Sequence, residues 1–142
     1  MNPAPLLDPS NGSIKMLWRS ISYAPGSGQS FYAAAEAPAW NGPYTWHTQN
    51  LFPRFAWCHI EDGFLYKTKR GFHALFHSDC EKTSGGAAGG HAYSLDGVHW
   101  VFHPRNAYDN NVTLSSGEVW SLSRRERPKL ILDRTTGEPN RG

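Results

Sequence analysis

Residues 60–77 read IEDGFLYKTKRGFHALFH, and this stretch decides how the whole chain is interpreted. Two adjacent carboxylates, Glu61 and Asp62, precede the short apolar run 64–66. The polar residues 67–71 end in glycine, which is typical of a hairpin turn, and a second apolar run follows them. The stretch therefore predicts an acidic pair, a strand, a turn and a returning strand.

The same arrangement recurs near each end of the chain. Pro3 precedes an apolar pair and a glycine-containing turn, and Pro128 precedes an apolar triplet and a similar turn. Gly63 holds the corresponding place in residues 60–77, so the copies are about 60 and about 65 residues apart. Repeats of this kind indicate a stacked or radial all-β architecture. The third copy is expected to end before its returning strand.

Proline and glycine punctuate the rest of the sequence, and no window has convincing helical periodicity. The alanine-rich residues 32–39 are interrupted by Pro38, so we interpret them as strand followed by loop. The Gly/Ala/Ser segment 84–90 is predicted to be a mobile loop. Runs rich in Val, Thr, Tyr, Phe and Trp predict further strands, at residues 30–36, after the turn 40–46, and at 91–94, 99–102, 112–114 and 119–122.

Each unit therefore supplies about four strands in meander order, which is the pattern of a β-propeller blade. We predict one blade over residues 1–59, a second over residues 60–125, and the first strand of a third over residues 126–142. A closed propeller needs at least about four blades, so the chain is interpreted as a partial propeller domain and a fragment of a longer protein.

The composition excludes several classes of protein. Apolar residues make up 39% and aromatic residues 13% of the 142 residues, which is typical of a globular domain and not of a disordered chain. The net charge of +2 and the scattered basic residues argue against a nucleic-acid partner. No apolar stretch approaches the ~20 residues of a membrane span, so no membrane partner is expected.

Secretion and metal binding are judged from the N-terminal residues, the cysteines and the histidines. No signal peptide is recognisable at the N-terminus. Cys58 and Cys80 can form one disulfide or none, and the glycosylation sequons at Asn11 and Asn111 matter only if the protein is secreted. The cysteines and histidines lack a tight metal-binding spacing, so neither a metal site nor a cofactor is expected.

Several stretches of the chain together resemble a known family. They are Asn2-Pro3, the turn 40–44, Glu61-Asp62, GGHAYSLDGVHW at residues 89–100, and Glu126-Arg127-Pro128. In this order and spacing they resemble the five-bladed propeller glycosidases of the arabinanase, levansucrase and invertase type, particularly the family-43-like proteins. The resemblance covers nearly the whole chain but only part of the family's fold, and it implies a five-bladed propeller with a carbohydrate substrate.

The resemblance also implies a set of site residues. In such enzymes acidic residues at the start of the innermost strands line a central funnel, as base or nucleophile, as a group that tunes a pKa, and as general acid. Asp62 and Glu126 match such positions, and Glu61 is a third catalytic candidate. Asn2 stands where a catalytic Asp is expected, but an amide cannot act as a general base. Gly63 replaces the Pro of the motif. Substrate contacts are expected from Asn2, His77, His91 and Arg127.

The three residues that open successive blades should share one location. Equivalent positions in neighbouring blades are related by rotation about the propeller axis. We therefore expect Asn2, Asp62 and Glu126 to face one funnel, and His77 and His91 to lie farther out or beneath.

Each assignment has a structural alternative. Glu61 and Asp62 can be a strand-start pair that only accepts hydrogen bonds, and strand alternation predicts that both cannot face the funnel. Glu126 can belong to an ion-pair network with the arginines around it, and His77 and His91 can be half-buried, hydrogen-bonded histidines. The tryptophans fit a core role better than a role as sugar platforms; they are Trp18, Trp40, Trp46 and Trp57.

The sequence thus supports two main functional hypotheses. The first is a glycoside hydrolase or transglycosidase that acts on plant or microbial polysaccharide through funnel carboxylates. The alternative is a non-catalytic, carbohydrate-binding or scaffold propeller with a degenerate site. A sialidase-like propeller is a weaker third hypothesis, because only one Asp-box-like turn is present, at residues 96–100. The sequence leaves the localisation open, and a secreted parent protein is one alternative.

Overall fold

The computed structural model describes residues 2–21, 30–48, 50–83 and 86–140 of the chain. These residues form antiparallel β-strands joined by turns, and the one helical element among them is a single 3-10 turn, η1 (Pro53–Phe55). The prediction of an all-β chain is therefore confirmed. No described element is a helix long and apolar enough to cross a bilayer.

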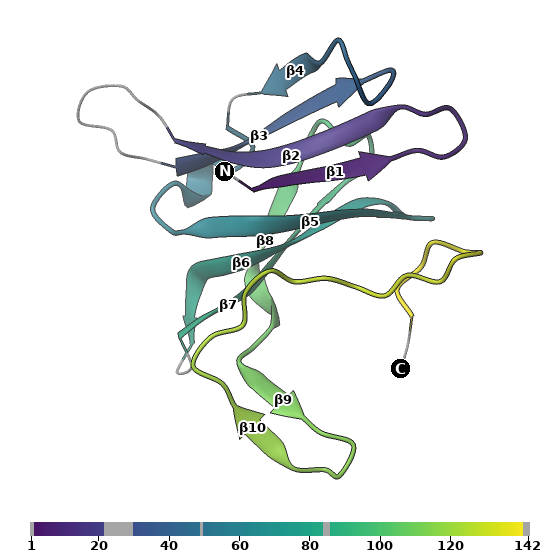
Figure 1. Cartoon of the computed structure of the whole chain (residues 1–142). Coiled ribbons are helices and arrows are strands. Elements are labelled where there is room, and N and C mark those ends of the chain that lie inside the picture. Colours follow the sequence, from purple (N-terminus) through teal and green to yellow (C-terminus); the bar gives the residue numbers. More distant parts are fainter. Residues whose placement is uncertain (1, 22–29, 49, 84–85, 141–142) are drawn as a thin grey trace.

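Two four-stranded sheets make up most of the structure, and each is a meander in which neighbours in sequence are neighbours in space (Figure 1). The first sheet consists of β1 (Pro3–Leu7), β2 (Ile14–Ile21), β3 (Ser30–Ala37) and β4 (Thr45–Thr48). The second consists of β5 (Ile60–Thr68), β6 (Gly71–Thr83), β7 (Gly86–Ser94) and β8 (Val101–Tyr108). A separate hairpin is formed by β9 (Asn111–Thr113) and β10 (Val119–Ser121). None of these sheets closes on itself.

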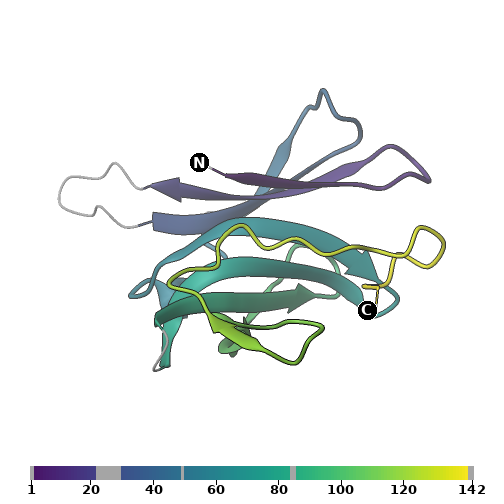
Figure 2. The same cartoon turned by 60° about the horizontal axis from the view of Figure 1, so that its bottom comes forward.

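Aromatic side chains form the core between the two sheets, which lie one above the other in Figure 2. Phe76 of β6 and Leu17 of β2 are fully buried. Tyr32 of β3 packs edge-on against Phe76 with ring centroids 4.8 Å apart, and Phe52 packs edge-on against the same ring. Phe102 of β8 lies 5.2 Å from Phe52. The segment that connects the sheets therefore fills the space between them.

The alanine-rich segment forms strand β3, as predicted, and the turn of the central hairpin is shorter than predicted. The register pairs Lys67 with Phe72 and Thr68 with Gly71, so the turn is Lys69-Arg70 alone. The strand β5 also begins before the acidic pair rather than after it. The polar residues at 67 and 68 extend the ladder because Thr68 favours a strand and because pairing across β5 and β6 outweighs the weak β-propensity of Lys67.

The prediction of a loop over residues 84–90 is wrong for residues 86–90, which belong to β7; residues 84 and 85 lie outside the described residues. The glycines of this segment allow aromatic rings of β8 to pack against the backbone of β7. A Cβ atom added at Gly89 would lie 2.1 Å from two ring carbons of Tyr108, and one at Gly90 would lie 2.8 Å from the ring of Phe102. Glycine inside a strand is typical of such close approach. The β8 rings therefore lie directly on the β7 backbone.

The third predicted hairpin is present in minimal form. Leu132 and Pro139 form an isolated antiparallel bridge, so the chain does return within the described residues, which corrects the expectation that it stops first. The amide of Asp133 donates to the carbonyl of Glu138 at 2.8 Å. The segment before this turn crosses the face of the second sheet (Figure 1). On this segment, Lys129 Nζ lies 5.0 Å from the centre of the Phe64 ring.

One disulfide joins Cys58 to Cys80 of β6, with Cα atoms 4.9 Å apart. The open question of the pairing is thereby answered, and neither thiol is free to bind a metal. The bridge fixes the connecting segment after η1 against the second sheet.

We expect Gly89→Ala to destabilise the protein by about 1–3 kcal/mol, because the added methyl group displaces the Tyr108 ring. Urea denaturation followed by fluorescence measures the change. In a Tyr108→Ala background the ring is absent, so the same substitution should cost less than half as much. Equal costs in both backgrounds would contradict this packing.

We expect the double variant Cys58→Ala/Cys80→Ala to lose about 3 kcal/mol of unfolding free energy, because the bridge spans 22 residues and restricts the unfolded chain. Denaturant unfolding at pH 7 provides the measurement. Addition of a reductant should shift the parent protein toward the double variant and leave the double variant unchanged. A parent protein that is insensitive to the reductant would argue against the bridge.

Candidate functional site

A bulge in β5 shapes the site. Glu61 pairs with His77 and Phe64 pairs with Leu75, so two residues, Asp62 and Gly63, stand opposite one residue of β6. Asp62 has a φ of 54°, in the left-handed region, which aspartate and asparagine tolerate better than most residues. The regular alternation of side chains is interrupted at this point. The two carboxylates have different partners, so the prediction that both cannot face one funnel stays a prediction.

Gly63 has a specific role in this bulge. Its amide donates a buried hydrogen bond to the Tyr32 hydroxyl at 3.1 Å, and a Cβ atom in its place would lie 3.2 Å from the Phe76 ring. Proline has no N–H to donate. Gly63, which stands where the resemblance implies a proline, therefore ties the bulge to the core.

Asp62 is buried, with 7% of its surface exposed, and two segments distant in sequence supply its partners. Asn2 donates a hydrogen bond from Nδ2 to Oδ1 of Asp62. Arg127 Nε lies 3.9 Å from Oδ2 of the same carboxylate. Arg127 also has a φ of 54°, so the chain turns sharply beside this contact. The starts of the three repeated units thus meet at Asp62.

Glu61 is the second carboxylate of the bulge, and basic groups surround it. Arg19 Nη1 contacts Oε2 at 2.9 Å, while His59 Nε2 and His77 Nδ1 lie 3.1 Å and 3.5 Å from Oε1. Burial raises the pKa of the Glu61 carboxyl, but the hydrogen bond from His59 and the charges of His59 and Arg19 outweigh it. The pKa therefore lies below its ordinary value, and Glu61 is ionised at neutral pH.

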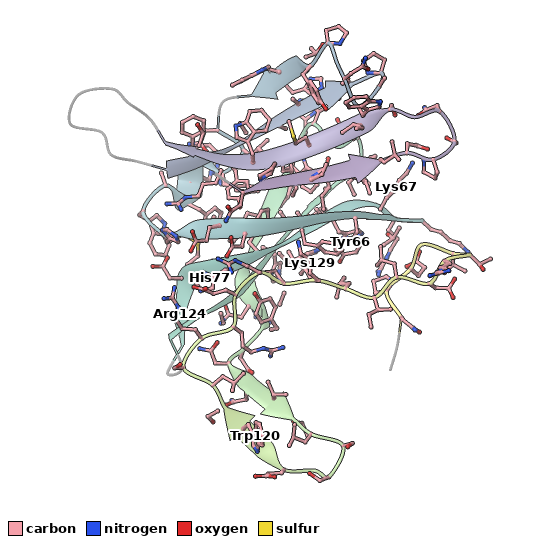
Figure 3. The ribbon with its side chains drawn as sticks, viewed as in Figure 1. Tyr66, Lys67, His77, Trp120, Arg124 and Lys129 are labelled. Atoms are coloured by element: carbon pink, nitrogen blue, oxygen red, sulfur yellow. A yellow bond between two sulfur atoms is a disulfide. The ribbon has the colours of Figure 1, made fainter. Side chains whose placement is uncertain are left out.

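Glu126 approaches from the segment that follows β10. A carboxylate oxygen of Glu126, one of Glu61 and a ring nitrogen of His77 all lie within 4.8 Å of one another. Glu126 also forms an ion pair with Arg124, whereas His77 is almost fully buried. Figure 3 shows His77 and Arg124 toward one end of the second sheet and Lys67 toward the other.

Six of the seven site residues predicted from the sequence form two groups that are linked by chain neighbours: Asn2, Asp62 and Arg127 make up one, and Glu61, His77 and Glu126 make up the other. His91 does not join them through any contact described. It belongs to a ladder of stacked rings across β5, β6 and β7, in which its Nε2 lies 3.1 Å from Nδ1 of His73. Tyr66 of β5 stacks on His73, and Tyr93 of β7 stacks on His91.

Sequence reasoning missed Arg19, His59 and Tyr32 as parts of the site. Arg19 lies within β2, and Tyr32 lies within an alanine-rich strand, so no local motif marks either residue. His59 stands two positions before Glu61, a spacing that places side chains on one face of a strand. That spacing is the one signal available in the sequence.

The tryptophans correct another expectation. Trp40, Trp46 and Trp57 are exposed, with 77%, 61% and 66% of their surfaces accessible, so the core interpretation is wrong for them. Trp18 is half-buried and packs edge-on against Trp46 at 4.9 Å between ring centroids. The turns and short strands that carry these residues have too little buried area to enclose an indole ring.

Comparisons of this chain with protein-family models, with curated proteins and with solved structures find no match. The residues of the site and their geometry therefore carry the functional argument alone.

We expect the stability of the protein to fall as the pH falls from about 6.5 toward about 4. Burial, and then the neighbouring His73 and His103, lower the pKa of His91 to about 4, whereas the unfolded chain takes up this proton near pH 6.5. Denaturation midpoints at several pH values measure the loss. His73, whose pKa is also lowered and which faces Arg70 and Glu138, adds to the same trend.

The variant His91→Phe keeps a ring in the ladder but removes its titration, so its stability should depend less on pH in this window. Tyr93→Phe, at the ring next to His91 in the ladder, is the matched control and should keep the parent's pH dependence. An unchanged slope for His91→Phe would contradict the assignment.

Proposed function

We propose that this protein is a glycoside hydrolase-like propeller that acts on the glycosidic bonds of plant or microbial polysaccharide. The two four-stranded meanders correspond to two blades, and the segment after β10 begins a third. The observation that carries the proposal is the convergence of Asn2, Asp62 and Arg127 on one point. Each belongs to the opening motif of a different repeat, as residues that face one funnel must.

The carboxylates have distinct surroundings, as glycosidic chemistry requires. Asp62 is buried and oriented by Asn2 and Arg127, which suits a base, a nucleophile or a group that stabilises positive charge on the sugar ring. Glu126 is more exposed and lies on a segment without regular strand pairing, which suits a general acid that must reach a leaving-group oxygen. Glu61 remains ionised between Arg19 and His59, so it supports the site electrostatically.

A non-catalytic carbohydrate-binding propeller is the second candidate. It is favoured by the contacts of Asp62, since both of its oxygens already have partners and Asn2 supplies an amide where a third carboxylate is expected. Exposed indole rings are suitable platforms for sugar rings, and Trp40 and Trp57 present such surfaces.

We expect Asp62→Asn and Glu126→Gln each to reduce hydrolysis by about 10²- to 10⁴-fold, because each removes a group that transfers or stabilises charge in the transition state. Release of reducing sugar from a panel of plant and microbial polysaccharides provides the measurement. Glu118→Gln is the matched control, because this exposed carboxylate lies in the turn between β9 and β10.

Full activity in both variants would contradict the catalytic proposal. If the parent protein binds a polysaccharide in affinity electrophoresis but releases no sugar, the binding-module candidate replaces it. Far-ultraviolet circular dichroism of each variant establishes that the fold is retained.

A further inference from the structure

His77 has an environment that the proposed hydrolysis does not explain. Only 3% of its surface is exposed, and neither ring nitrogen has a hydrogen-bond partner. Buried polar groups are almost always paired, because leaving one without a partner costs about 1–3 kcal/mol. A buried imidazole without hydrogen bonds has a nitrogen lone pair available to a hydrogen-bond donor or to a metal ion.

The carboxylate oxygen of Glu61 that is nearest to His77 does not form a hydrogen bond with the imidazole. Nδ1 of His77 and Oε1 of Glu61 are 3.5 Å apart without hydrogen-bond geometry. Two ligands of a tetrahedral zinc ion, with bonds of about 2.0–2.1 Å, are separated by roughly 3.3 Å along the edge of the tetrahedron. The spacing between His77 and Glu61 is therefore close to that of two ligands on one metal ion.

Glu126 supplies a third donor to the same point. Its carboxylate oxygen lies within 4.8 Å of the donor atoms of His77 and Glu61. Glu126 is on an exposed segment, so a small rotation of its side chain can shorten this distance. Three protein ligands with a remaining open position are the usual arrangement of a zinc site that also binds water or another ligand.

Neighbouring arginines orient the two carboxylates. Arg19 holds Oε2 of Glu61 at 2.9 Å, which leaves Oε1 directed toward His77, and Arg124 contacts Glu126. Groups of this kind fix the orientation of metal-binding side chains. His59 Nε2 also reaches Oε1 of Glu61, at 3.1 Å, and competes for that oxygen when no metal is bound.

We propose that Glu61, His77 and Glu126 bind one zinc ion. One imidazole with two carboxylates matches zinc better than magnesium or calcium, which prefer oxygen ligands alone. The cysteines take no part, because both are in the disulfide. The inference stands on ligand geometry and not on hydrolysis, although Glu126 is shared with the proposed function. A zinc-bound Glu126 cannot donate a proton, so zinc should inhibit any hydrolytic activity.

The test uses the full chain without a histidine tag, after treatment with a chelator. Titration with Co²⁺ provides a visible absorption signal, and isothermal titration with Zn²⁺ gives the affinity and stoichiometry. We expect about one ion per chain and displacement of Co²⁺ by Zn²⁺. His77→Gln and Glu126→Gln should each weaken Zn²⁺ binding by at least about tenfold.

The double variant His73→Gln/His91→Gln is the matched control, because these histidines lie on the same sheet but outside the donor cluster. It should bind Zn²⁺ as the parent protein does. Glu126→Gln changes an exposed side chain, so it tests the site even if His77→Gln does not fold. The proposal is overturned if the parent binds neither ion, if Glu126→Gln binds Zn²⁺ unchanged, or if the control variant loses the ion. None of these readouts requires hydrolysis, so the two proposals fail separately.

Discussion

The hydrogen bond from the Gly63 amide to the Tyr32 hydroxyl, 3.1 Å long and fully buried, is the contact on which the site depends. Tyr32 belongs to the first sheet, and its ring packs edge-on against Phe76 of the second. Burial raises the pKa of the Tyr32 hydroxyl far above its ordinary value, so it remains neutral at all ordinary pH values. A rigid aromatic core therefore holds the backbone of the bulge, and Asp62 keeps its left-handed conformation next to that anchor.

Charge balance then brings distant segments to the bulge. Two adjacent carboxylates at the edge of a core are costly unless cations and hydrogen-bond donors meet them. Arg19 reaches Glu61 from β2, and Arg127 reaches Asp62 from the segment after β10. Neither arginine is near the bulge in sequence. These two contacts therefore hold distant segments at the bulge, which hydrogen bonding between neighbouring strands does not do. The hydrogen bond and charge of His59, together with the charge of Arg19, outweigh the effect of burial and keep the pKa of the Glu61 carboxyl below its ordinary value.

Local patterns predicted the strands well, because hairpins and meanders are formed by neighbours in sequence. The alanine-rich strand β3 followed from Pro38, which ends any helix there, and the turn between β5 and β6 followed from Gly71. The strand at residues 86–90 was not predictable in this way. Its glycines are explained by the rings of Tyr108 and Phe102, and those contacts exist only after β8 has folded back. Arg19 was missed because its contact with Glu61 joins residues that are far apart in sequence.

The bulge also explains why the site and the core can share one strand. In β5, Tyr66 and Phe64 pair with His73 and Leu75 on one face, while Leu65 faces the core. Without an extra residue, strict alternation would place Glu61 on the core face with Leu65 and turn Ile60 outward. The inserted residue reverses this phase, so Ile60 joins the core and Glu61 stands opposite His77. A single extra residue thus allows an apolar strand to carry two carboxylates near its first residue. The accompanying cost is one strained backbone conformation, at Asp62.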